Sequence, residues 1–82
     1  MRKVVNQKLG TFLKYSRQSK ELTLREVEAT TKISNAYVSQ LESGHVADPS
    51  PTMLDKLADC YGVSYTKLMK LAGYRIPEEA DL

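Results

Sequence analysis

The chain has 82 residues, 41% of them hydrophobic, a formal net charge of +2 and one cysteine. This length makes one small domain, and a single cysteine excludes an intramolecular disulfide, so the composition fits a reducing cytoplasm. No apolar run approaches the ~20 residues that a membrane-spanning helix needs, and the start MRKVVNQKLG lacks the apolar centre of a signal peptide. We therefore expect a cytoplasmic protein without a membrane segment.

Charge is distributed unevenly along the chain. Residues 1–32 carry eight basic and three acidic groups, whereas residues 33–82 carry four basic and seven acidic groups. A basic first half is a candidate phosphate-facing surface. A solvated charged surface is the more common explanation of such a bias when it stands alone.

Five helices are predicted in chain order, and no strand pattern competes with them. The first covers about residues 5–19, and the second begins at Thr23 and ends near Thr31. Thr23 and Glu26 have the spacing of a capping box. The apolar face of the first helix consists of Val5, Leu9, Phe12 and Leu13.

The third predicted helix, residues 35–43, has an unusual outer face. Ser34 is its cap and Gly44 suits a left-handed position beyond its end. One face carries the apolar residues Tyr37, Val38 and Leu41, while the other carries short amide, hydroxyl and methyl groups. Side chains of this kind can read base edges in the major groove of DNA. Two short helices joined by a tight turn, with such a face on the second, form a helix-turn-helix pattern.

The remaining segments are predicted from caps and stop signals. After a loop at residues 45–49, Ser50 caps a fourth helix with Pro51 at its first position, and Gly62 ends it. Ser64 caps a fifth helix over residues 65–72, and residues 74–82 form an extended tail. The inner stripe of the fourth helix is Leu54, Leu57, Ala58 and Tyr61, and the apolar residues of the fifth are Leu68, Met69, Leu71 and Ala72.

Taken together, these residues resemble the lambda-repressor-like, or Cro-type, helix-turn-helix regulators of the XRE family over about residues 9–72. The resemblance implies a compact all-α domain of five helices over residues 1–73, with helices two and three as the helix-turn-helix, and neither enzymatic activity nor a cofactor. Its matching residues are Leu9-Gly10, Leu13, Arg17, Leu22-Thr23, Glu26-Val27, Ile33-Ser34, residues 37–42, Gly44, Pro51, Leu54, Leu57-Ala58, Gly62-Val63-Ser64 and Leu68.

Three positions depart from the family pattern. Leu24 stands where the family usually has a glutamine that touches a phosphate, which puts that contact in doubt. Glu28 replaces a small residue, and Lys32 replaces a turn glycine. If Lys32 adopts a positive φ, its backbone is strained.

The resemblance also implies roles for individual residues. Arg17 and Glu42 are expected to form a structural ion pair that orients the third helix. For Tyr37, a packing role is an equal alternative to a phosphate contact. From their residue type alone, Lys32, Lys14 and His45 could add phosphate contacts, although such residues are more often plain surface. The expected base contacts are Asn35, Ala36, Ser39 and Gln40. The expected phosphate contacts are Thr23, Leu24, Lys32, Tyr37 and Ser43.

The predicted function is sequence-specific binding of double-stranded DNA by a transcriptional regulator, with repression as the favoured role, acting as a homodimer on an inverted repeat. Dimerisation is expected through Tyr65, Met69, Tyr74 and Ile76, which would otherwise close the core. The alternatives are a protein–protein adaptor or antitoxin-like module, and the DNA-binding part of an enzyme. With His45 as the only histidine and no glycine-rich phosphate loop, no metal site or catalytic constellation is expected.

Overall fold

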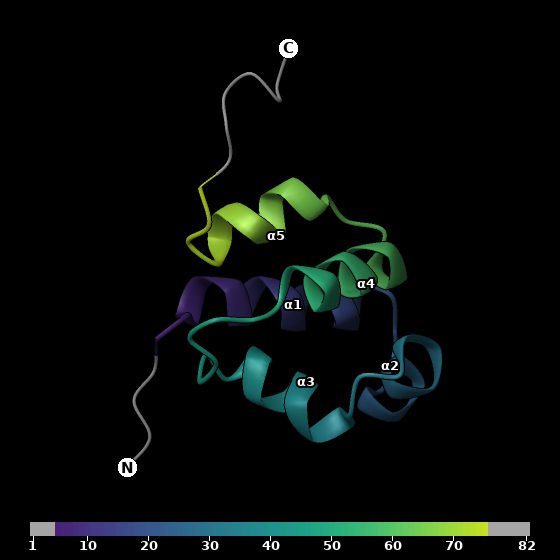
Figure 1. The fold of residues 1–82 in the computed structure, drawn as a ribbon. Helices are drawn as coiled ribbons and strands as arrows, with labels where there is room; N and C mark the ends of the chain where they lie inside the picture. The colour runs from purple at the N-terminus through teal and green to yellow at the C-terminus, as the bar shows by residue number, and fades with distance from the viewer. Residues whose placement is uncertain (1–4, 76–82) are drawn as a thin grey trace.

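The computed structural model describes residues 5–75, which contain five helices and no strand. Their order around a common core is seen in Figure 1, and the predicted all-α class is confirmed. The helices are α1 (Gln7–Ser19), α2 (Leu24–Thr31), α3 (Asn35–Glu42), α4 (Pro51–Tyr61) and α5 (Tyr65–Leu71). Within these residues, no helix has both the length and the apolar character needed to cross a membrane.

Every helix contributes at least one fully buried apolar side chain to a single core. Helix α1 runs through the middle of the bundle, with α3 packed on one side of it and α5 on the other (Figure 1). The two outer helices therefore present opposite surfaces of the molecule. The core residues are Leu9, Leu13, Val27, Ile33, Val38, Leu41, Leu54, Leu57, Ala58, Tyr61 and Leu68.

The predicted start of the first helix is wrong by two residues. Helix α1 begins at Gln7, and Val5 is 44% exposed and does not belong to the core. The backbone N–H groups of Val5 and Asn6 both donate to the carbonyl of Gly44, at 2.8 and 3.0 Å. The Asn6 amide also donates to the carbonyl oxygens of Val46 and Ala47. These contacts hold residues 5 and 6 against the loop after α3, which prevents the helix from extending backwards.

The other helix ends agree with their local signals. Thr23 and Glu26 form the reciprocal capping box, and Gly62 adopts a left-handed φ of 68° after α4. Helix α3 ends at Glu42, one residue earlier than predicted, with Ser43 as its cap. The side-chain oxygens of Ser34, Ser50 and Ser64 accept backbone hydrogen bonds at the starts of α3, α4 and α5.

The turn between α2 and α3 is fixed by two neighbouring residues. Lys32 has a φ of 66°, so the positive φ considered from the sequence is present. The buried Thr31 hydroxyl donates to the Val27 carbonyl at 2.8 Å and accepts from the Ile33 N–H at 3.2 Å. Thr31 thereby satisfies backbone groups on both sides of the turn, which sets the direction in which α3 leaves it.

Candidate nucleic-acid interface

The outer face of α3 is open to solvent, while its inner face is anchored in the core. Val38 and Leu41 are at most 1% exposed. The four side chains expected to contact bases are all exposed and belong to this one short helix: Asn35, Ala36, Ser39 and Gln40. The face therefore presents amide and hydroxyl groups that no packing requirement explains.

The position of α3 is set by a close approach to α1. A Cβ atom built on Gly10 would lie 2.6 Å from the carbonyl oxygens of both Leu41 and Glu42. Such a separation is far inside van der Waals contact, so only glycine allows α1 to come this near to the last turn of α3. Helix α3 thus packs directly against the backbone of α1.

An ion pair holds the same end of α3. The Arg17 Nε donates to one Glu42 carboxylate oxygen at 2.6 Å and its Nη2 to the other at 3.0 Å, with side-chain exposures of 12% and 7%. The third nitrogen, Nη1, donates to the carbonyl of Leu22 at 2.7 Å. The hydrogen bond with Glu42 raises the pKa of Arg17 above its ordinary value, although burial opposes the shift. This pair is the one that the family resemblance implies, and it joins α1, α3 and the start of α2.

The predicted phosphate contacts occupy different ends of the helix-turn-helix. Thr23 and Leu24 lie at the start of α2, directly after Leu22. The Arg17 guanidinium donates both to the Leu22 carbonyl and to Glu42, which precedes Ser43. Arg17 therefore connects the start of α2 to the end of α3. Thr23 and Ser43 are exposed, whereas Leu24 is half-buried against the core. The Thr23 and Ser43 hydroxyls are engaged with the Glu26 N–H and the Ser39 carbonyl.

Two further phosphate candidates lie nearer the beginning of α3. Lys32 is exposed in the turn. Tyr37 is half-buried and packs against the core, and partial burial, with a smaller effect of Tyr74, raises the pKa of its phenol. The packing alternative considered for Tyr37 is therefore present in the structure, and a phosphate contact through its hydroxyl stays a prediction.

The start of α3 holds a contact that the sequence did not predict. The Asn35 side-chain amide donates to Glu28 Oε1 at 2.6 Å, and the Asn35 backbone N–H donates to the same oxygen at 3.2 Å. The sequence marks Glu28 only as a departure from a small residue. Its partner lies seven positions away on the next helix, and helical periodicity does not predict contacts across the turn that separates the two helices.

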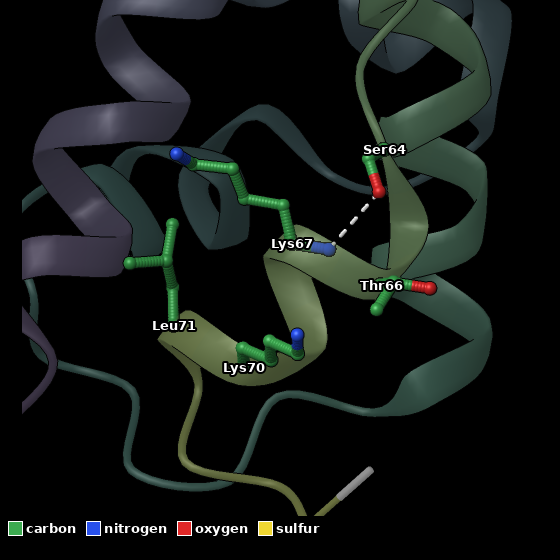
Figure 2. Close-up of a pocket in the computed structure, with 5 residues that line it drawn as sticks. All are labelled: Ser64, Thr66, Lys67, Lys70 and Leu71. Carbon is green, nitrogen blue, oxygen red and sulfur yellow. Dashed lines mark hydrogen bonds between the residues drawn. The ribbon is translucent and has the colours of Figure 1, made fainter. Parts of the chain in front are cut away.

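Two surface hollows among residues 5–75 bear on the lysine candidates. One hollow has a volume of about 340 Å³ and is lined by Lys14 and Glu42 among others, which places this lysine beside the end of α3. Another, of about 500 Å³, lies along α5 (Figure 2), where the Ser64 hydroxyl caps the Lys67 N–H. The residues that line this second hollow all come from α5 and its cap, on the side of α1 opposite α3.

Residues 13–68 match the helix-turn-helix family. The chain belongs to this family. It is 35% identical over 72 residues to the uncharacterized HTH-type transcriptional regulator RghRB of Bacillus subtilis, a match that covers 85% of this chain and 52% of that protein. It is 32% identical over 65 residues to the HTH-type transcriptional repressor RghR of the same organism, covering 79% and 48%. The chain thus spans about half the length of these two helix-turn-helix relatives.

Other members of the helix-turn-helix family match over more of their length. The uncharacterized HTH-type transcriptional regulator y4dJ of Sinorhizobium fredii is 39% identical over 69 residues, covering 84% of this chain and 83% of that protein. The crystal structure of the clp gene regulator ClgR from Corynebacterium glutamicum superposes with a TM-score of 0.71 at 27% identity, covering 89% of this chain and 77% of that one. The XRE-type resemblance inferred from the sequence is confirmed.

Proposed function

We propose that the chain is a cytoplasmic, sequence-specific regulator of transcription, a repressor, that binds double-stranded DNA by placing α3 in the major groove. The observation that carries the proposal is the outer face of α3, where four small polar or methyl side chains are exposed on a helix whose inner face is buried. The relatives named as transcriptional regulators support it. An α-helix fits the major groove, where each base pair presents a distinct pattern of donors and acceptors.

Within the proposed interface, base contacts and phosphate contacts divide between α3 and its flanks. Asn35 and Gln40 can each pair with adenine through a donor and an acceptor, Ala36 can meet a thymine methyl, and Ser39 can donate or accept. The exposed groups at the start of α2 and in the turn would hold the backbone and set the register. We assign the phosphate contacts to Thr23, the Leu24 backbone, Lys32, Tyr37, Ser43 and Lys14.

The experiment that tests this division compares three alanine variants. Gln40→Ala should weaken binding to the selected duplex by about 1–3 kcal/mol and leave random duplex almost unaffected. Lys32→Ala should weaken both and flatten the dependence of affinity on salt concentration. Lys70→Ala removes a positive charge from α5, which lies on the side of α1 opposite α3, and should leave the affinity for both duplexes and its salt dependence unchanged.

Titration of each variant against both duplexes at two salt concentrations decides the outcome. Equal losses on both duplexes for Gln40→Ala would remove base readout from α3. Failure of the unaltered chain to bind any duplex in a salt-dependent way would favour the adaptor or antitoxin-like alternative.

A further inference from the structure

The acidic side chain at the start of α3 is unexpected on a surface proposed to face phosphates. Glu28 is half-buried in α2, and one of its carboxylate oxygens accepts two hydrogen bonds from Asn35, at 2.6 Å from the side-chain amide and 3.2 Å from the backbone N–H. The first N–H groups of a helix lack partners within it, so the backbone contact is a favourable helix-capping interaction. That function is already served in part by Ser34, which accepts from the Tyr37 N–H.

The side-chain contact fixes the orientation of the Asn35 amide. A carboxylate only accepts hydrogen bonds, so the group that faces Glu28 must be the NH₂ of Asn35 and not its carbonyl. A hydrogen bond to an ionised acceptor is stronger than a neutral one. Rotation of the amide by half a turn would direct two oxygen atoms at each other, and this flipped state is therefore strongly disfavoured.

The groups left free on Asn35 are its carbonyl oxygen and one N–H. This pair, an acceptor beside a donor, complements the major-groove edge of adenine, which offers an amino donor and the N7 acceptor. An amide free to flip would instead present its two ends in either order. Locking it before DNA arrives removes the cost of ordering the side chain on binding.

We propose that Glu28 is a specificity-determining positioning residue, which holds the Asn35 amide in the orientation that selects adenine at the base pair facing the start of α3. This inference rests on the proposed DNA-binding function and deepens it. Glu28 itself touches no base. It acts through Asn35 and lowers affinity for DNA in general, because its charge lies near the phosphates.

The test begins with duplexes that the unaltered chain selects from a random-sequence pool, followed by single base-pair changes at each position. Asn35→Ala identifies the base pair read by Asn35 as the one where preference falls, by about 5-fold to 100-fold, and adenine is the expected base there. Glu28→Ala should lower the preference at that same base pair by about 3-fold to 10-fold and leave the preference at the Gln40 base pair intact. The double variant should behave like Asn35→Ala alone.

Glu28→Gln separates position from charge. The Asn35 backbone N–H also donates to this oxygen, so it should keep the carbonyl of the new glutamine, and not its NH₂ group, facing Asn35. Base preference should then stay within about twofold of the original, while affinity for random duplex rises because a negative charge is lost. If Glu28 instead had a purely structural role, Glu28→Ala would lower the preference at all base pairs together. Urea unfolding of Glu28→Ala would then show a matching loss of stability.

Failure of the inference is distinguishable from failure of the proposed function. If the unaltered chain selects no sequence, the proposed function fails and the inference fails with it. If it selects a sequence but Asn35→Ala changes no preference, Glu28 merely withdraws Asn35 from the groove and the inference is overturned. The inference is also overturned if Glu28→Ala keeps full preference at the Asn35 base pair.

Discussion

Lys32 combines backbone strain with an exposed positive charge in the turn of the helix-turn-helix. Its φ of 66° lies in the left-handed region, which costs an L-residue roughly 1–2 kcal/mol, partly offset by the entropy that glycine would lose there. We expect Lys32→Gly to raise the free energy of unfolding by about 0.5–1 kcal/mol in urea titrations. The same variant should bind all duplexes more weakly, because a proposed phosphate contact is lost.

Lys32→Ala provides the matched control. It removes the charge but keeps a Cβ atom at a positive φ, so it should lose affinity without gaining stability. Equal stabilisation by alanine and glycine would show that strain at this residue is not the cause.

Tyr61 buries a hydroxyl that has no hydrogen-bond partner among residues 5–75. An unsatisfied buried polar group costs about 1–3 kcal/mol, so Tyr61→Phe should unfold at the same or a higher urea concentration than the unaltered chain. Tyr74→Phe is the control, because the Tyr74 hydroxyl donates to the Pro49 carbonyl at 2.7 Å. The free energy of unfolding of Tyr74→Phe should fall by about 1 kcal/mol. A clear loss of stability in Tyr61→Phe would show that the Tyr61 hydroxyl does have a hydrogen-bond partner.

The pH dependence of Tyr61 follows from the same burial. Desolvation, with a smaller effect of the Glu42 charge, raises the pKa of the Tyr61 phenol well above that of an ordinary tyrosine. The unfolded chain therefore releases this proton first, and its contribution makes stability fall as pH rises above about 10. Tyr61→Phe should reduce that alkaline loss, whereas an unchanged slope of unfolding free energy against pH would refute the link.

At the scale of helices, the contact between α1 and α3 depends on Gly10. Alanine is favoured over glycine inside a helix by about 1 kcal/mol, but here its Cβ would lie 2.6 Å from two carbonyl oxygens of α3. Overpacking of this kind costs about 1–3 kcal/mol, so we expect Gly10→Ala to destabilise the fold and to weaken specific DNA binding by displacing α3. Gln18→Ala, at an exposed position of α1, should do neither. Stabilisation by Gly10→Ala would mean that the helices separate at no cost.

Helix existence was predictable from local chemistry, whereas some boundaries and contacts were not. Ser34, Ser50 and Gly62 mark their helix ends because caps and left-handed stops act within a few residues. The start of α1 differs from the prediction because Asn6 is held by carbonyls some 40 residues further along the chain. The contact between Glu28 and Asn35 was not predictable for the same reason, since it depends on the angle at which α2 meets α3.

At the scale of the whole molecule, the predicted dimer interface in the C-terminal part exposes less apolar surface than the sequence suggested. Met69 and Tyr74 are half-buried and pack against the core, Tyr65 is 37% exposed, and Ile76 lies outside the described residues. The alternative that these side chains close the core thus holds for Met69 and Tyr74. A homodimer on an inverted repeat stays a proposal, with Tyr65 as its remaining described anchor.

Spacing tests the proposed dimer directly. Two copies should bind an inverted repeat cooperatively, and inserting about 5 base pairs between half-sites should abolish the cooperativity by rotating them to opposite sides of the duplex. Tyr65→Ser should reduce this cooperativity but leave the affinity of one copy for a single half-site unchanged. Tyr15→Ser, which removes a ring that is 69% exposed on α1, is the control. Cooperativity that survives the insertion, or that depends on Tyr15 instead, would count against the C-terminal interface.

The exposure of the α3 outer face has an evolutionary consequence. The side chains of Ala36, Ser39 and Gln40 are exposed and contribute nothing to the core, while α3 is held in place from behind by Gly10 and Arg17. Surface substitutions away from special features change stability by no more than about 0.5 kcal/mol. Descendants of this chain can therefore change their target site by mutation at three positions without losing the fold. Asn35 is the exception, because a new residue there removes the side-chain partner of Glu28 and leaves only the backbone N–H, so positions 28 and 35 are expected to change together.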